Sequence, residues 1–263
     1  MGLAKGLEVV DFNNFSKEVP MNQYYKLIYD ILRFGKDSDD RTGVGTLFVF
    51  GEMLKFDLQQ GFPLLPGKHT SFRTIAAELL WFLSGSSNNE RLKEFNGSEN
   101  DTIWEEWALS EPYKEEEIEL YDKGELGPIY GVQWRYWSSG YGDCIDQIED
   151  LINGLKKRPF SRRHIVSAWN PECLPDESES SFENVINERM ALAPCHYSFQ
   201  MNVRKLEDWE RTKLLDKEVL KEWRNEVNIC HESEIEEIDK KYMELMDDKN
   251  IPKFAISCLV NLR

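Results

Sequence analysis

Two segments near the end of the chain alternate between apolar and polar residues with a period of two. Residues 196–203 carry apolar side chains at Tyr197, Phe199, Met201 and Val203. Residues 254–262 do so at Phe254, Ile256, Cys258, Val260 and Leu262. Successive side chains of a strand point to opposite faces, so this spacing predicts two β-strands with one apolar face each. Residues 163–170 (RHIVSAWN) predict a further strand.

Other segments have the spacing of helices. From Gln23, apolar residues recur three or four positions apart until Gly35, which ends the predicted helix. Residues 71–85 give the clearest helical pattern, with Gly85 as a cap. Its wide apolar stripe consists of Phe72, Ile75, Ala76, Leu79, Leu80 and Leu83. Residues 144–155 repeat the helical pattern.

The remaining segments complete the predicted fold. Residues 37–46 read as a turn-rich loop, residues 46–58 as one or two strands, and residues 110–126 as an acidic loop. Strands and helices therefore mix without a regular βαβ alternation. This favours an α+β fold over a doubly wound parallel sheet. We find no apolar run near the roughly 20 residues of a membrane span, so we expect no membrane association.

Two stretches differ in composition from the rest. Residues 1–20 have weak periodicity and predict an N-terminal arm, which leaves residues 21–263 as the main domain. Residues 205–250 are highly charged, can form helices and lie between the two alternating strands. We interpret them as a solvated helical insertion at the tip of a hairpin, with a regulatory or partner-binding role as the alternative.

The charge of the chain constrains its partners. The formal net charge is −16 and the pI is about 4.8, which disfavours nucleic acid as a partner. A local arginine cluster can still hold a small anion. The five cysteines include no CxxC pair and leave an odd thiol, so we expect a reducing, cytoplasmic setting. The four histidines are not clustered and predict no metal site.

Cys195 is the first candidate for chemistry. In APCH (193–196), Pro194 biases the chain toward extended geometry, and Cys195 then opens a predicted strand, where a thiol can face a cavity. A catalytic cysteine needs its thiolate stabilised, usually by nearby cations. The alternative is a buried structural cysteine. His196 would point to the opposite face of the strand, which makes it a poor base for Cys195.

Arginines are the second candidates. Arg41 lies in a glycine-containing loop (DDRTGVGT), Arg162 and Arg163 precede a strand, and Arg263 ends the chain. Guanidinium groups bind phosphate through paired hydrogen bonds, although each of these arginines taken alone is more often a solvated surface residue.

Glu78 and two tryptophans complete the candidates. Glu78 lies next to the apolar stripe of its helix, where burying a carboxylate costs free energy unless it is paired or acts as an acid or base. The alternative is a glutamate at the rim of the core whose carboxylate reaches solvent. Trp104 and Trp107 are three residues apart and predict either core packing or a wall on which a flat heterocycle stacks.

Several of these segments, in this order, resemble the thymidylate synthase family. They are DRTGVGT, GFPLLPGK, ELLWFLSG, TIWEEWA, LGPIYGVQWR, SRRHIVSAWNP and MALAPCHYSFQ. The resemblance runs over about residues 22–204 and resumes at 252–263. It implies an α+β fold with a large twisted mixed sheet and packed helices, and a homodimer that forms through the sheet. It also implies reductive methylation of dUMP to dTMP, with 5,10-methylenetetrahydrofolate as co-substrate and no metal.

The resemblance also implies roles for individual residues. Cys195 matches the nucleophile that adds to C6 of the pyrimidine, Glu78 the glutamate that organises proton transfer, and Tyr130 the tyrosine near the C5 proton. The dUMP phosphate ligands would be Arg41 and Arg263 together with Arg162 and Arg163, which reach into the partner subunit. Folate contacts would be Trp104, Trp107, Leu192 and Lys68.

The sequence also departs from the family pattern. His69 stands where a basic residue is usual, Ser71 where histidine is frequent, and Leu262 where glutamine is usual. The chain ends at Arg263, inside the RSxDxxLGxPFN motif, so we expect a partial sequence that is inactive alone. A pyrimidine-nucleotide hydroxymethylase of the same superfamily, acting on deoxyuridylate or deoxycytidylate, is one alternative. A non-catalytic binding protein that uses residues 205–250 is another.

Overall fold

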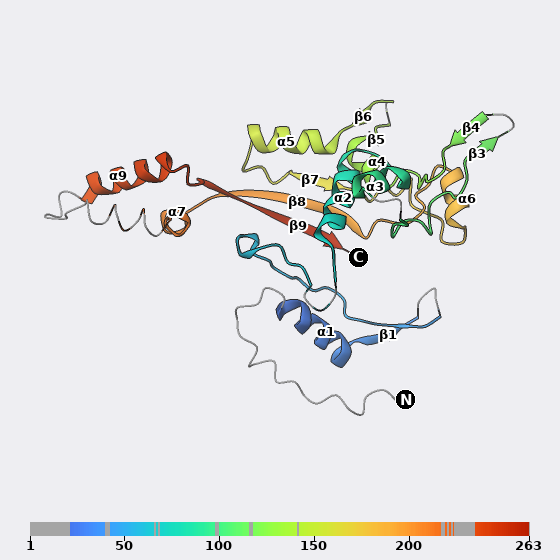
Figure 1. Cartoon of the computed structure of the whole chain (residues 1–263), viewed down its shortest axis with the longest axis horizontal. Helices are drawn as coiled ribbons and strands as arrows, with labels where there is room; N and C mark the ends of the chain where they lie inside the picture. The colour runs from blue at the N-terminus through green and yellow to red at the C-terminus, as the bar shows by residue number, and fades with distance from the viewer. Residues whose placement is uncertain are drawn as a thin grey trace. The chain divides into compact units, whose positions relative to one another are not determined.

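The computed structural model describes residues 22–39, 43–65, 67, 69–97, 100–115, 118–140, 142–216, 219, 221, 223 and 235–262. The chain, drawn in Figure 1, divides into two compact units, residues 1–72 and 73–263. The predicted N-terminal arm lies outside the described residues. Within the described part of the chain, no helix is long and apolar enough to cross a bilayer.

Glycine ends the first helix of the first unit, as predicted. Helix α1 (Asn22–Phe34) is followed by Gly35, whose N–H donates to the Ile31 carbonyl at 2.8 Å. A Cβ at this position would lie 2.3 Å from the same oxygen, so a larger residue would have to displace the backbone. Strand β1 (Lys36–Ser38) then pairs antiparallel with β2 (Thr46–Phe48). The prediction of a loop over residues 37–46 was therefore wrong at its N-terminal end, whereas β2 begins at Thr46, where a strand was predicted.

Residues 46–58 form much less strand than the sequence predicts. Only β2 is regular, and a 3-10 helix, η2 (Leu58–Gln60), follows. The side chain of Gln23 on α1 accepts the N–H of Lys55 at 2.7 Å and also donates to the carbonyl of Lys55. These two bonds satisfy backbone groups that a neighbouring strand would otherwise pair.

The second unit contains most of the helices. Those before residue 190 are α2 (Phe72–Leu83), α3 (Asn89–Asn96), α4 (Tyr130–Arg135), α5 (Gln147–Lys157) and α6 (Ser181–Ile186). Helix α5 begins later than its pattern predicts, because Asp146 caps it by accepting the N–H of Glu149. The preceding residues form strand β6 (Cys144–Ile145), which pairs with β5 (Trp137–Ser138).

The largest sheet among the described residues has three antiparallel strands in the order β7-β8-β9. These are β7 (Ile165–Ser167), β8 (His196–Lys205) and β9 (Phe254–Leu262). The alternating segments predict β8 and β9, and the strand predicted over residues 163–170 is shorter than expected. The predicted acidic loop over residues 110–126 instead contains a hairpin of β3 (Tyr113–Glu115) and β4 (Ile118–Tyr121). The mixture of helices with small antiparallel sheets confirms the α+β class. The large mixed sheet that the resemblance implies is not found among the described residues, whose strand pairs are all antiparallel.

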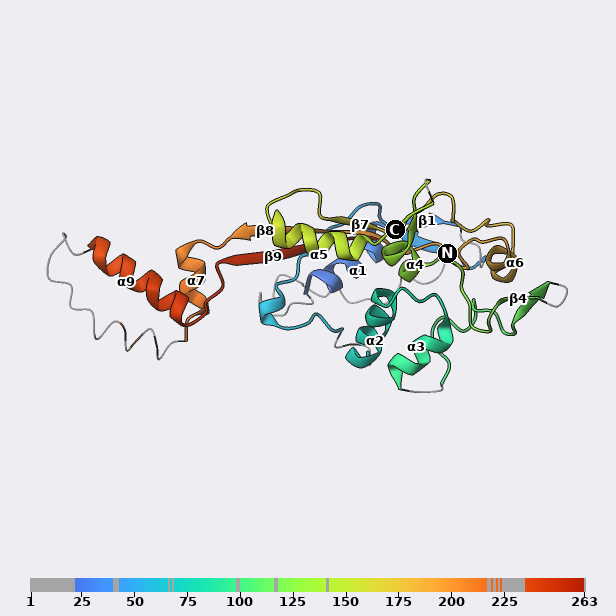
Figure 2. The ribbon, with the colours of Figure 1, turned by 90° about the horizontal axis from the view of Figure 1, so that it is seen from above.

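Helices α7 (Asp208–Leu214) and α9 (Ile235–Asp248) lie beyond one end of the β8–β9 ribbon, as both views show (Figures 1 and 2). Arg211 of α7 is buried and links α7 to α9 and to the residues that follow α9. Its guanidinium donates to Asp247 of α9 at 2.8 Å and to the Ile251 carbonyl at 3.1 Å. The segment therefore has a polar centre of its own.

The buried face of α2 differs from the apolar stripe that its spacing predicts. Ala77, Trp81 and Phe82 are buried, whereas Leu79 and Leu80 are 49% and 54% exposed. Trp81 and Phe82 are neighbours in the ring cluster of the core, at 5.2 Å between centroids. Their aromatic surface outweighs the smaller gain from burying leucine at the other positions. The same cluster contains Trp104 and Tyr130.

Candidate active site

Two segments that are distant in sequence lie side by side and form the site. The N–H of Ala191 donates to the Leu126 carbonyl at 2.9 Å. Gly127 has a φ of +70°, and a Cβ there would lie only 2.1 Å from the carbonyl oxygen of Arg189. Glycine is thus required for this close approach. The contact places LGPIYG (126–131) against MALAPCH (190–196).

The hydroxyl of Tyr130 holds the backbone at Cys195. Its oxygen accepts the N–H of Cys195 at 2.7 Å and the N–H of His196 at 3.2 Å. The same oxygen lies 3.5 Å from Nδ1 of His196. The tyrosine is only 4% exposed, whereas Cys195 is exposed. A rigid buried phenol therefore fixes the chain from which an accessible thiol projects, a contact that sequence reasoning did not find.

The surroundings of Tyr130 keep its hydroxyl protonated. Burial raises the pKa of Tyr130, and the hydrogen bonds from the backbone of His196 and Cys195 oppose this only in part. Electrostatic interactions with Cys195 and Glu78 raise the pKa of Tyr130 further. At neutral pH the group is thus a neutral phenol that accepts two N–H bonds and retains one proton.

Glu78 is linked to the same cluster through Trp104. The indole N–H of Trp104 donates to the Glu78 carboxylate at 2.7 Å. Glu78 is half-buried and is therefore neither sealed in the core nor fully solvated. A hydrogen bond to a carboxylate is stronger than a neutral one, so it fixes the orientation of the indole ring.

Rings join these groups into one cluster. Trp104 packs edge-to-face on Tyr130 at 6.1 Å and on Trp107 at 6.5 Å, and Tyr130 lies 4.4 Å from Phe82. Leu192 packs against the same core. Trp104 is buried and Trp107 half-buried, so the first is a core residue and the second offers part of its ring to solvent. The ring cluster thus brings together six of the predicted site residues, which are Cys195, Tyr130, Glu78, Trp104, Trp107 and Leu192.

Comparison with known protein families matches residues 22–219 to thymidylate synthase, which is more than half of the chain. The chain belongs to the thymidylate synthase family. Membership supports a methyltransferase of nucleotide biosynthesis that uses methylenetetrahydrofolate, and it agrees with the α+β fold. Among the described residues, no cluster of His, Cys, Asp and Glu forms a metal site.

The arginines that would hold a nucleotide phosphate in this family are not gathered at Cys195 within the described residues. Arg162 and Arg163 are exposed in the turn between α5 and β7. The Arg162 carbonyl accepts a hydrogen bond from Gln200 at 3.2 Å, and the guanidinium groups of both arginines form no ion pair with described residues. Arg41, Lys68 and Arg263 lie outside the described residues.

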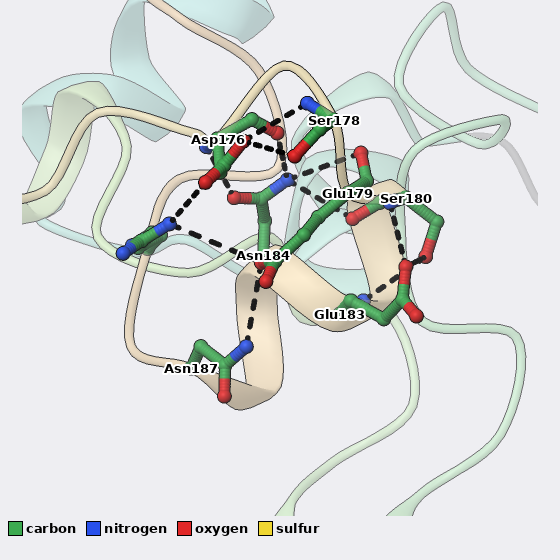
Figure 3. Close-up of polar contacts among 8 residues, drawn as sticks. Asp176, Ser178, Glu179, Ser180, Glu183, Asn184 and Asn187 are labelled. Carbon is green, nitrogen blue, oxygen red and sulfur yellow. Dashed lines mark hydrogen bonds and ion pairs between the residues drawn. The ribbon is translucent and has the colours of Figure 1, made fainter.

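The segment before MALAPCH is held by a buried asparagine, which sequence reasoning missed (Figure 3). The amide of Asn184 accepts the N–H of Asp176 at 2.7 Å and donates to the carbonyls of Asp176 and Ser180, both at 3.0 Å. Ser180 and Glu183 form a capping box on α6, and the hydrogen bonds from Ser180 lower the pKa of Glu183. The S-x-x-E spacing was the signal that could have predicted this helix.

Cys195 differs from the half-buried Cys173 in the same unit. Burial raises the pKa of Cys173, although a hydrogen bond with Gln133 lowers it in part. A thiol with a raised pKa supplies less thiolate at neutral pH and is a weaker nucleophile in practice. Because Cys195 is exposed, whereas Cys173 is half-buried and has a raised pKa, Cys195 is the better candidate for covalent chemistry.

Proposed function

We propose that this protein catalyses the reductive methylation of dUMP to dTMP with 5,10-methylenetetrahydrofolate. The observation that carries the proposal is that Cys195 has an exposed thiol, while its backbone N–H donates a hydrogen bond to the buried hydroxyl of Tyr130. Catalytic nucleophiles need a fixed position and access to substrate, and this arrangement provides both.

The chain's residues account for the steps at the pyrimidine. The thiolate of Cys195 forms a bond to C6, and the electron pair of the C5–C6 double bond moves toward C5 and O4. This makes C5 nucleophilic. The folate supplies the one-carbon unit and the hydride. After C5 has gained the new bond, its proton leaves to a base in the polar network near Tyr130. Loss of this proton would be coupled to cleavage of the bond between the one-carbon unit and the folate nitrogen. Hydride from the folate would then convert the one-carbon unit into a methyl group, as the S–C6 bond breaks, the thiolate of Cys195 leaves and the C5–C6 double bond returns.

The ring cluster fits a folate. Trp107 offers part of its ring, Leu192 adds apolar surface, and the Trp104 indole is fixed by Glu78. A flat pterin stacks favourably on such a surface. The carboxylate of Glu78 lies at the edge of this wall, where it can hold water and transfer protons near the pyrimidine O4. We assign Lys68 to the folate tail from the family motif.

The phosphate of dUMP would be bound by Arg41 and Arg263 with Arg162 and Arg163 from the partner subunit. The guanidinium groups of Arg162 and Arg163 are exposed and form no ion pair with described residues, which supports this assignment. We propose a homodimer that forms through the sheet. The apolar side chains of Ile256 and Val260 on β9 are 64% and 47% exposed, which leaves surface for a partner to bury. We propose a cytoplasmic location.

The first test is covalent capture and turnover. With 5-fluoro-dUMP and methylenetetrahydrofolate, we expect a covalent ternary complex at Cys195, detected by mass spectrometry. Cys195→Ser should abolish the complex and turnover while circular dichroism is unchanged. Cys144→Ser is the matched control, since Cys144 is also an exposed free thiol of this unit and should not matter. Activity of Cys195→Ser above a few percent would refute the assignment of the nucleophile.

Product analysis separates the two chemistries of the superfamily. With dUMP or dCMP as substrate, formation of dihydrofolate supports the synthase, whereas retention of tetrahydrofolate supports a hydroxymethylase. Absence of both products and of the covalent complex would favour a non-catalytic binding protein.

Mixed dimers test the shared site. Arg162→Ala and Cys195→Ser variants are each expected to be inactive alone. Mixing them should restore part of the activity, because some sites then combine an intact thiol with intact arginines from the other subunit. Failure of any mixture to recover activity, with dimers verified by light scattering, would count against arginines contributed across subunits.

A further inference from the structure

A polar network joins helix α3 to the turn that carries Trp104 and Trp107. Asn89, the first residue of α3, is 0% exposed. Its amide nitrogen donates to the Glu105 carboxylate at 2.6 Å, and its amide oxygen accepts the hydroxyl proton of Thr102. One buried side chain thus bonds two residues of the turn, one on each side of Trp104.

Lys93, one helical turn after Asn89, binds the same carboxylate. Its ammonium group lies 2.9 Å from Oε2 of Glu105 and 3.0 Å from Oε1 of Glu90. The side chain of Lys93 is only 12% exposed, so water screens these ion pairs less than it screens pairs at the surface. Hydrogen bonds with Glu105 and Glu90 raise the pKa of Lys93, so the lysine keeps its charge at neutral pH.

The network reaches both indoles through the backbone of the turn. The hydroxyl oxygen of Thr102 accepts the N–H of Trp104 at 3.1 Å, and the Trp104 carbonyl accepts the N–H of Trp107 at 3.1 Å. The ring of Trp104 is also held by Glu78. Among the described residues, the indole N–H of Trp107 has no hydrogen-bond partner, so the orientation of this ring depends on the turn and on its packing with Trp104.

We propose that Asn89, Lys93 and Glu105 are positioning residues for the folate, because they set the orientation of the two indoles on which it stacks. This inference rests on the proposed function. The anchor of the network is fixed, since the backbone N–H of Asn89 donates to the Gly124 carbonyl at 2.7 Å. Any other arrangement of the turn would leave the buried amide without partners, which costs free energy. A wall held in one arrangement binds a flat ligand with less loss of entropy.

Glu105→Leu and Glu106→Leu form a matched pair of variants. Both remove one carboxylate from the same turn, but Glu106 is exposed and has no hydrogen bond or ion pair with the described residues. In the full chain, covalent complex formation at saturating 5-fluoro-dUMP is measured against the concentration of methylenetetrahydrofolate. We expect Glu105→Leu to raise the half-saturating folate concentration about tenfold, because only a fraction of the molecules then presents the indoles correctly. Glu106→Leu should raise it less than about twofold.

Conservative variants test the mechanism of positioning. Glu105→Gln keeps an oxygen that accepts from Asn89 and loses the charge, so it should recover most of the folate affinity that Glu105→Leu loses. Lys93→Met keeps the Asn89 bonds and the apolar stem, and about a threefold loss is expected. It replaces Glu105→Leu as the test if circular dichroism shows that Glu105→Leu does not fold. Faster hydrogen exchange at the amide of Trp107 should accompany each loss.

A purely structural role predicts a different result. A lower Tm in Glu105→Leu with an unchanged half-saturating folate concentration would overturn the proposal. Equal losses of affinity for 5-fluoro-dUMP and for folate would also overturn it, because the disturbance would then extend over the whole site. If the unmodified chain forms no covalent complex, the proposed function fails and this inference fails with it. If that complex forms and the folate dependence is the same in Glu105→Leu and Glu106→Leu, only this inference is refuted.

Discussion

Replacing Tyr130 with phenylalanine removes the hydroxyl while keeping the buried ring. The oxygen accepts two N–H bonds, from Cys195 at 2.7 Å and from His196 at 3.2 Å. Net contributions of about 0.5–1.5 kcal/mol per hydrogen bond give a loss of about 2 kcal/mol. Contacts of the ring with Phe82 and Trp104 remain, so no cavity term is added.

The predicted loss is large enough to measure. For a unit of residues 73–263, about 2–4 °C per kcal/mol corresponds to a fall in Tm of about 4–8 °C. Differential scanning calorimetry gives this shift. Native-state hydrogen exchange should show lost protection at the amides of Cys195 and His196, because these are the donors that lose their acceptor.

Tyr136→Phe is the matched control. Tyr136 is 55% exposed, and its hydroxyl forms no hydrogen bond with the described residues. We expect a change below about 0.5 kcal/mol, as for surface substitutions in general. The reasoning would be refuted if both variants lowered Tm equally, or if the amide of Cys195 kept its protection in Tyr130→Phe.

Two further predictions concern the charged segment between β8 and β9. Arg211→Met should lower the free energy of unfolding by about 2–3 kcal/mol, because the Ile251 carbonyl loses a buried donor and Asp247 loses its buried partner. Urea denaturation measures this loss, and an unchanged unfolding midpoint would contradict the prediction. The hydrogen bonds from Arg204 lower the pKa of Glu210 from 4.5 to about 2. The stabilisation from the ion pair of Arg204 and Glu210 is thus complete above about pH 4.5 and is lost as the pH falls toward 2. NMR titration of Glu210 measures its pKa, and a midpoint near 4.5 would contradict the prediction.

The sequence predicted the elements whose signal is local. Alternation at 196–203 and 254–262 gave β8 and β9, and the glycine at position 35 ended α1 where expected. The stripe of α2 was misread because spacing does not show which apolar face meets the large rings of the core. Trp81 and Phe82 decided that face, through partners that are distant in the sequence.

Sequence motifs named the candidate site residues, but they did not predict the contacts among them. The bond between Tyr130 and Cys195 joins residues 65 positions apart, and no periodicity encodes such a pair. The polar network around Asn184 was also missed, because a single asparagine among acidic and serine residues gives no sign that its side chain is buried. Motif resemblance gave the residues, and long-range packing gave their arrangement.

Tyr130 couples the stability of the core to the position of the thiol. Its ring belongs to the aromatic cluster, while its oxygen bonds the backbone at Cys195. Gly127 and the Ala191–Leu126 bond bring the two segments close enough for this contact. A substitution that loosens the cluster must therefore also loosen the thiol, whereas a change confined to α7 and α9 should leave the reactivity of Cys195 intact.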